Sequence, residues 1–181
     1  MKLFRLTLAM SFAALCGVAV ADSPKPGQPG AVVKSVTVKL NDAKGKSVGT
    51  AVLSPDPKGV KIKLDISGLK AGDHAIHVHE TSECTAPDFK SAGGHFNPDK
   101  KKHGMSNPDG PHAGDMPNFT VDAKGKSTAE IIAPGVTLDD GAHSVFTGAG
   151  TALVIHDKAD DMKTDPAGAA GDRVACGVIK K

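Results

Sequence analysis

A segment of about forty residues, 80–118, most limits what this chain can fold into. The segment is rich in Gly, Pro, Asn, Asp and His, and it contains almost no apolar residues that could form a core. A loop of this length inside a compact domain is uncommon, and it is either disordered or held by another interaction. The hydrophobic core must therefore come from the sequences on either side.

Those flanking sequences have the period-two alternation of β-strands. In 32–40 (VVKSVTVKL) and 60–66 (VKIKLDI), apolar residues alternate with polar or charged ones, which indicates strands with one buried face. Shorter strands are predicted at 50–53, 75–78, 119–121, 128–132, 153–156 and 174–179. No stretch keeps a helical period, so the pattern predicts an all-β fold, an antiparallel sandwich or barrel.

Residues 1–21 have the pattern of a secretory signal peptide. Two positive charges in 1–5 precede a nearly uninterrupted apolar run, 6–20, and 19–21 (AVA) is a small-x-small cleavage pattern. A transmembrane anchor would need about 18 to 20 apolar residues. We therefore expect cleavage after residue 21, export, and no stable membrane association of the mature chain.

The next nine residues, 22–30 (DSPKPGQPG), contain three Pro and two Gly and predict a flexible arm. The ordered domain is expected to cover 31–181. A lipoprotein signal that uses Cys16 is a weaker alternative, because Leu15 stands where a small residue would be expected.

Composition argues against one class of partner, nucleic acid. Cleavage removes Lys2 and Arg5 but no acidic residue, which lowers the formal charge from +2 to 0. The longest basic run left is KKK at 100–102, and Trp and Tyr are absent. The mature chain has no longer basic run, and its only aromatic side chains for base stacking are six or fewer Phe, so we expect no nucleic-acid binding.

Two cysteines, Cys84 and Cys176, remain after cleavage. An even pair in an exported chain most simply forms a disulfide. Two free thiols, or two metal ligands, are the alternatives that the sequence leaves open.

Histidines supply the chemistry that the long segment otherwise lacks. His77 and His79 are two apart in a predicted strand, so both side chains leave the same face. Further candidate ligands are His95, His103, His112, Asp115 and His156. Imidazole binds zinc and copper, and a carboxylate can complete a zinc site. A single loop histidine is most often merely solvated, but seven such groups together predict metal binding.

The number of ligands predicts two sites that share a member. A tetrahedral site takes four groups, so seven groups serve two sites only if one side chain belongs to both. A bridging imidazolate is the obvious candidate, but spacing alone does not say which histidine it is.

These residues lie in motifs that resemble a known family. The motifs are HVHE at 77–80, GGHFNP at 93–98, HG at 103–104, HAGD at 112–115, VIH at 154–156 with KADD at 158–161, and GDRVACGVI at 171–179. In this order they resemble the copper, zinc superoxide dismutases of the bacterial exported type, over about 32–181. The resemblance implies a Greek-key barrel of about eight strands, with a long metal-binding loop and a shorter electrostatic loop, in the periplasm.

The resemblance also implies a role for each candidate residue. Copper would be held by His77, His79, His95 and His156, and zinc by His95, His103, His112 and Asp115, with one ion of each kind per subunit. His95 would be the bridge, Asp160 would join a copper histidine to a zinc histidine, and Cys84 and Cys176 would form the disulfide. Arg173 would guide the anionic substrate.

The activity implied is dismutation of superoxide to dioxygen and hydrogen peroxide, with His95 and Arg173 as catalytic residues. Two alternatives remain: an exported copper or zinc carrier without catalytic activity, and an interaction module with structural metals. A carrier does not explain a guanidinium such as Arg173 close to Cys176 in the sequence. Structural metals would need redox-silent sites, whereas an all-histidine copper site is expected to be reducible. The family contains monomers and dimers, so a homodimer stays open.

Two histidines and one triplet fall outside this scheme. His74 is three residues before His77 and is expected to point to the opposite strand face, in a packing or hydrogen-bonding role. His143 matches no ligand position and is expected to be solvated. The triplet Asn118-Phe119-Thr120 matches a glycosylation sequon, but such triplets are common by chance.

Overall fold

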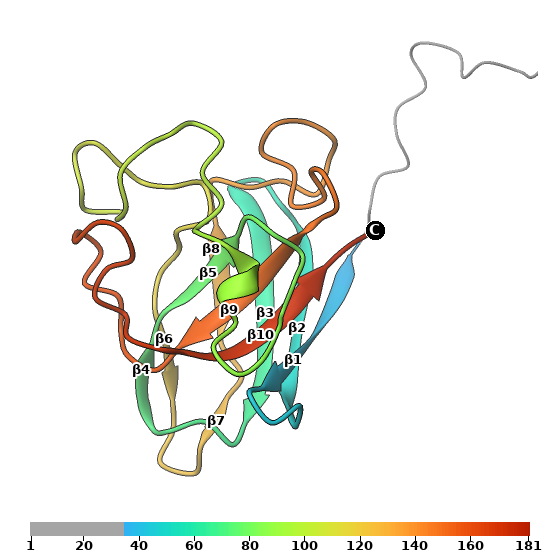
Figure 1. The fold of residues 1–181 in the computed structure, drawn as a ribbon, viewed down its shortest axis with the longest axis vertical. Coiled ribbons are helices and arrows are strands. Elements are labelled where there is room, and N and C mark those ends of the chain that lie inside the picture. Colours follow the sequence, from blue (N-terminus) through green and yellow to red (C-terminus); the bar gives the residue numbers. More distant parts are fainter. Residues whose placement is uncertain (1–34) are drawn as a thin grey trace, which may run out of the picture.

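The computed structural model describes residues 35–181. The predicted signal peptide, the predicted arm and the predicted domain start at residue 31 lie outside the described residues. Within 35–181 the chain is all-β (Figure 1), with one 3-10 turn, η1 (Lys90–Ala92). The strands are β1 (Val36–Asp42), β2 (Ser47–Asp56), β3 (Gly59–Ser67), β4 (Gly72–His74), β5 (Ile76–His79), β6 (Phe119–Val121), β7 (Lys126–Ser127), β8 (Glu130–Ala133), β9 (Thr151–His156) and β10 (Arg173–Ile179).

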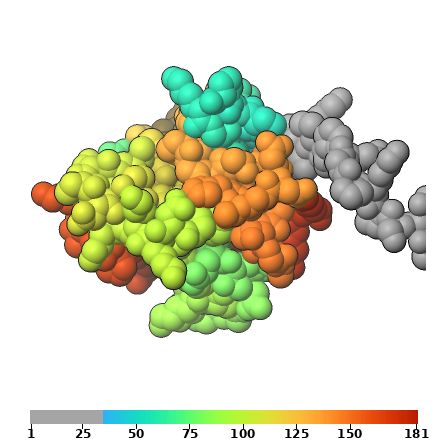
Figure 2. Space-filling view, turned by 90° about the horizontal axis from the view of Figure 1, so that it is seen from above, coloured from blue at the N-terminus to red at the C-terminus, as the bar shows by residue number. Residues whose placement is uncertain are grey.

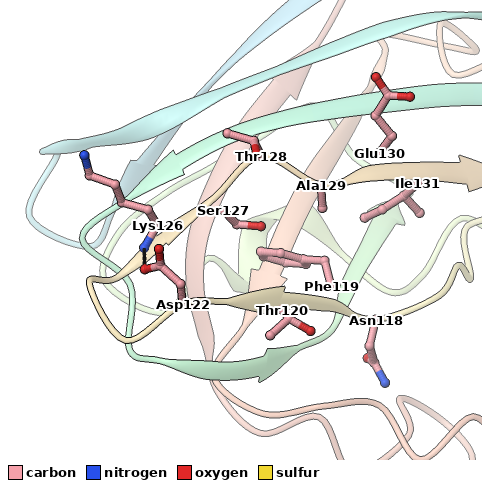
Figure 3. A pocket seen from close by; sticks show the side chains of 10 residues that line it. All are labelled: Asn118, Phe119, Thr120, Asp122, Lys126, Ser127, Thr128, Ala129, Glu130 and Ile131. Carbon is pink, nitrogen blue, oxygen red and sulfur yellow. Dashed lines mark hydrogen bonds between the residues drawn. The ribbon is translucent and has the colours of Figure 1, made fainter.

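The strands curl into an antiparallel barrel. The main sheet has the order β5-β9-β10-β1-β2-β3-β7, and β8 also pairs with β3. A second, two-stranded sheet pairs β4 with β6. Because β4 runs directly into β5, β6 extends the order at one end, so that β6 and β8 face each other across the remaining opening. Figure 3 shows this opening, lined by residues of β6, β7 and β8.

Eight of the ten strands match predicted ones. The strands predicted at 75–78 and 128–132 correspond to β5 and β8. Two short strands that precede them, β4 and β7, were not predicted and are separated from them by Ala75 and by residues 128–129. The return strand predicted at 50–53 is longer, because β2 pairs with β1 as far back as Ser47 and with β3 as far on as Asp56. The all-β, antiparallel prediction is confirmed.

The core follows from the alternation of apolar residues. In β3, Val60, Ile62, Leu64 and Ile66 are all buried, and the residues between them are more exposed. They pack in one cluster with residues of β1, β2, β5 and β9. Every second residue of these strands therefore faces the inside of the barrel.

Two strands are buried on both faces. All residues of β5 and β9 are buried, because their outer faces lie under the 80–118 segment and the 157–172 loop. Ile76 and Val78 belong to the core cluster, so the alternating His77 and His79 point outward from the barrel, beneath those loops. The predicted shared face of the two histidines is confirmed.

The start of the long segment is fastened to the outside of the barrel. Phe89 and Ala92 pack on Ala152 and Val154 of β9, where η1 lies against the sheet (Figure 1). Beside them Cys84 and Cys176 form a disulfide across 92 residues of sequence. The disulfide prediction is confirmed, and free thiols or cysteine metal ligands are excluded.

Within residues 35–181, no helix has the length and apolar character needed to cross a membrane.

Replacing both Cys84 and Cys176 by serine should lower the free energy of unfolding by about 2–5 kcal/mol, because a cross-link over so long a loop restricts the unfolded chain. Urea unfolding of the metal-free protein, followed by circular dichroism, measures this difference. The unchanged chain under reducing conditions should show the same loss. Equal stability of the oxidised chain and the double variant would contradict the prediction.

Candidate metal centre

The fold brings the seven predicted ligands together in two groups that share one histidine. The first group is His77, His79, His95 and His156, and the second is His95, His103, His112 and Asp115. All seven side chains are buried. In each group the potential ligand atoms lie within 4.8 Å of one another. His95 is therefore the shared residue that spacing alone did not identify.

The first group is built by two adjacent strands and one loop. His77 and His79 leave β5, and His156 ends the neighbouring β9. His95 is brought to them by an antiparallel bridge between residues 79 and 95. This bridge is possible because the loop runs back along β5, where Phe96 N donates to Val78 O and Val78 N donates to Gly114 O.

Four ring nitrogens of this group have no hydrogen-bond partner. They are Nδ1 of His77 and Nε2 of His79, His95 and His156, all buried. Leaving a buried polar atom without a partner costs about 1–3 kcal/mol. Four such atoms in one place are a donor set suited to a cation that prefers imidazole, such as copper or zinc.

The second group has the spacing of a tetrahedral metal site. Asp115 Oδ1 lies 2.8 Å from His95 Nδ1, 3.1 Å from His103 Nδ1 and 3.4 Å from His112 Nδ1. His95 Nδ1 is 3.2 Å from His103 Nδ1 and 3.4 Å from His112 Nδ1. Ligands at ordinary zinc distances in a tetrahedron are about 3.3 Å apart. The three imidazoles and one carboxylate therefore fit a zinc ion.

Burial keeps three rings of the first group, those of His79, His95 and His156, neutral. It lowers the pKa of His95 to about 4 and that of His156 to about 3, with neighbouring histidines adding to the effect. Burial and the proximity of His95 also hold the pKa of His79 well below its usual value. Because only a neutral imidazole has a free lone pair, these rings are ready to bind a metal at physiological pH.

One carboxylate connects the two groups. Asp160 Oδ2 accepts a hydrogen bond from His77 Nε2 at 2.8 Å, and Asp160 Oδ1 accepts one from His103 Nε2 at 3.0 Å. Burial alone would raise the pKa of Asp160, but these bonds outweigh it and hold the pKa below its usual range. Asp160 thus orients one ring of each group.

Close packing leaves this carboxylate one position. Gly168 has a positive φ of 63°, and a Cβ there would lie 1.7 Å from Asp160 Oδ1. Only glycine satisfies both the backbone conformation and the contact.

Arg173 lies beside the first group. Its Nη1 donates to Phe89 O and its Nη2 to Gly93 O, both at 2.8 Å. Gly93 O also accepts from His79 Nδ1 at 3.0 Å. The half-buried guanidinium and the His79 ring are therefore held by one carbonyl. The charge of Arg173 contributes to the lowered pKa of both His79 and His156.

The side chain of Arg173 also lines a surface pocket. The other lining residues are Pro87, Asp88, Lys90, Gly171 and Asp172. Figure 2 shows a different part of the surface, the end of the barrel at the top of Figure 1. There the yellow-green and orange loops lie side by side.

The two remaining histidines take structural places. His74 is buried, and its ring nitrogens lie at hydrogen-bond distance from the carbonyl oxygens of His156 (2.6 Å) and Lys70 (2.8 Å), which confirms the predicted structural role through hydrogen bonding. His143 is half-buried rather than fully solvated. It contacts Gly135 O and the carboxylate of Asp99, and these contacts raise its pKa.

Sequence reasoning missed the groups that hold the site from behind. The carbonyl of Gly93, the small size of Gly168 and the side chain of Asn118, which bonds the backbone of Asp160, carry no metal-binding signature. The sequon pattern drew attention to Asn118 for a different reason.

Comparisons with known proteins agree with this geometry. The family model of copper/zinc superoxide dismutase (SODC) matches residues 47–179. Superoxide dismutase (Cu-Zn) 1 of Aquifex aeolicus is 55% identical over 139 residues, which are 76% of this chain and 82% of that protein. The Caulobacter vibrioides superoxide dismutase (Cu-Zn) is 44% identical over 149 residues, 81% of this chain and 86% of the relative.

Solved structures give the same result. A mutant of a SOD-like protein from Bacillus subtilis is 39% identical, with a TM-score of 0.78 over 80% of this chain and 97% of the other. The Cu/Zn superoxide dismutase from Brucella abortus is 32% identical, with a TM-score of 0.66 over 81% of this chain and 99% of the other. The family model alone covers well over half of the residues. The chain belongs to the copper/zinc superoxide dismutase family.

Proposed function

We propose that this chain dismutes superoxide to dioxygen and hydrogen peroxide. The observation that carries the proposal is the convergence of four buried, unpartnered imidazole nitrogens beside a second ligand group that shares His95. The names of the relatives, at up to 55% identity, support the same activity. A metal carrier without catalysis is not favoured, since it has no use for the guanidinium of Arg173 beside the first group.

The two groups differ in their suitability for copper and zinc. His77, His79, His95 and His156 offer nitrogen atoms only, a donor set that suits copper in both of its oxidation states. His95, His103, His112 and Asp115 add a carboxylate and a tetrahedral spacing, which suit zinc. We therefore assign one copper to the first group and one zinc to the second.

Copper, when bound, supplies a one-electron redox couple that accepts an electron from one superoxide and gives it to another. The second half of this cycle needs two protons to form hydrogen peroxide, one of which comes from solvent water. His95 Nε2 belongs to the first group and His95 Nδ1 to the second. His95 holds a proton at Nε2 when that nitrogen is free, and passes it to the product.

Arg173 attracts and places the anion. Its guanidinium is positive at any physiological pH, and its bonds to the carbonyls of Phe89 and Gly93 hold it beside His79. A fixed positive charge next to the site raises the local concentration of superoxide and its rate of arrival. Lys90, at the rim of the same pocket, is paired with Asp88 at 3.0 Å.

Two features of the chain support a cellular location, and the family bears on its assembly. The charge and apolar pattern of residues 1–21 supports export, which in a bacterial cell leads to the periplasm. The Cys84–Cys176 disulfide supports an oxidising compartment. A homodimer is compatible with the family.

The mature chain loaded with copper and zinc should dismute superoxide, and a sample loaded with zinc alone should not, because zinc has no redox couple in proteins. A superoxide dismutation assay on both samples measures this. Two bound metals without copper-dependent activity would contradict the proposed enzyme.

Single ligand variants should separate the two sites. His156 belongs only to the first group and His112 only to the second, so H156A should lose copper and keep zinc, whereas H112A should weaken zinc first. Elemental analysis after dialysis of the loaded variants gives the metal content. Equal loss of both metals in both variants would contradict the assignment.

Arg173→Ile should lower kcat/KM by about tenfold, because a fixed guiding charge is lost, and should flatten its dependence on salt. Both metals should remain bound. Arg173→Lys is the matched control: it keeps the charge and should retain a salt dependence close to that of the unchanged chain. Unchanged kinetics in the isoleucine variant would remove Arg173 from the mechanism.

A further inference from the structure

Asn118 makes two hydrogen bonds with the backbone of one distant residue. Its Nδ2 donates to Asp160 O at 2.9 Å, and Asp160 N donates to its Oδ1 at 2.8 Å, across 42 residues of sequence. The amide thus satisfies both backbone groups of Asp160, as a neighbouring strand would. No other side chain in the described range 35–181 bonds both backbone groups of Asp160.

This attachment matters because every oxygen of the Asp160 carboxylate is already in use. Oδ2 accepts from His77 Nε2, and Oδ1 accepts from His103 Nε2 and from Met162 N. With Gly168 packed against Oδ1, a shift of the Asp160 backbone would have to break one of these bonds.

The residue that follows Asn118 is anchored in the core. Asn118 directly precedes β6, whose first residue, Phe119, is buried and belongs to the core cluster. In Figure 3 the side chains of Asn118 and Phe119 leave the chain in opposite directions. Asn118 therefore transmits the position of the rigid barrel to the loop that carries Asp160.

We propose that Asn118 is a positioning residue for the metal centre: by fixing the backbone of Asp160 it sets the orientation of His77 and His103 toward their ions. The proposal rests on the metal assignment made above. Both atoms of the Asn118 amide are engaged with the backbone of Asp160. The triplet that matches a glycosylation sequon therefore has a structural use, and its amide nitrogen is not free to carry a glycan.

The test uses Asn118→Ala, which removes both bonds, and Asn118→Asp, which has the same shape but loses the donor to Asp160 O. Thr120→Val is the matched control. It lies in the same triplet and loses a side-chain hydrogen bond that is shorter still, from Thr120 Oγ1 to Asp73 Oδ1 at 2.6 Å, without touching Asp160. Circular dichroism and urea unfolding of the metal-free proteins check folding and stability separately.

Two readouts follow in the otherwise unchanged mature chain. Zinc affinity, from competition with a chelator, should fall about tenfold in both Asn118 variants, since outer partners of metal-binding histidines affect affinity on this scale. In the zinc-loaded protein, the NMR signals of the His77 and His103 Nε2–H protons should shift and exchange faster with water. Thr120→Val should leave both readouts unchanged.

Asn118 variants that lose only unfolding free energy, with zinc affinity and both imidazole signals as in the unchanged chain, would overturn the proposal and leave Asn118 a purely structural residue. Equal weakening of zinc binding by Thr120→Val would overturn it as well. Failure of the unchanged chain itself to bind zinc would instead contradict the proposed function.

Discussion

The convergence of seven buried ligand side chains on two points is the constraint on which the rest of this structure depends. Residues 80–118 make up a large share of the domain, and few of them are apolar. Hydrophobic packing holds the segment only at a few buried side chains: Phe89, Ala92, Phe96, Ala113 and Met116. Polar groups supply the rest: four imidazole nitrogens without other partners, a tetrahedral group around Asp115, and a disulfide at the start of the segment.

The barrel makes this convergence possible. β5 and β9 lie next to each other and are buried on both faces, so His77, His79 and His156 leave a rigid surface rather than a loop. The loops then close over that surface and are tied to it. Asp160 holds one ring of each group, and Gly93 O joins His79 to Arg173. The proposed redox chemistry, proton transfer and attraction of the anion would thus depend on two sets of hydrogen bonds around neighbouring ligands.

Much of the fold was predictable because period-two alternation is a local property. The buried face of β3 and the shared face of His77 and His79 follow from it directly. The breaks in β4–β5 and β7–β8 were not predictable, because the barrel must bend there and alternation does not record bending. The candidate ligands could be named because imidazoles are rare enough to stand out.

The sequence by itself determined the strand pattern, the set of metal-binding side chains and the presence of one cysteine pair. Spacing left the shared histidine open, and the resemblance implied His95. Only the tertiary structure brought His95 into both groups, turned one nitrogen of each ring toward its group, and placed Asn118, Gly93 and Gly168 behind the centre. The physical reason is that distances across a long loop are set by the barrel to which it is fastened. Spacing along the chain says little about them, and backbone carbonyls and missing Cβ atoms leave no chemical signature in a sequence.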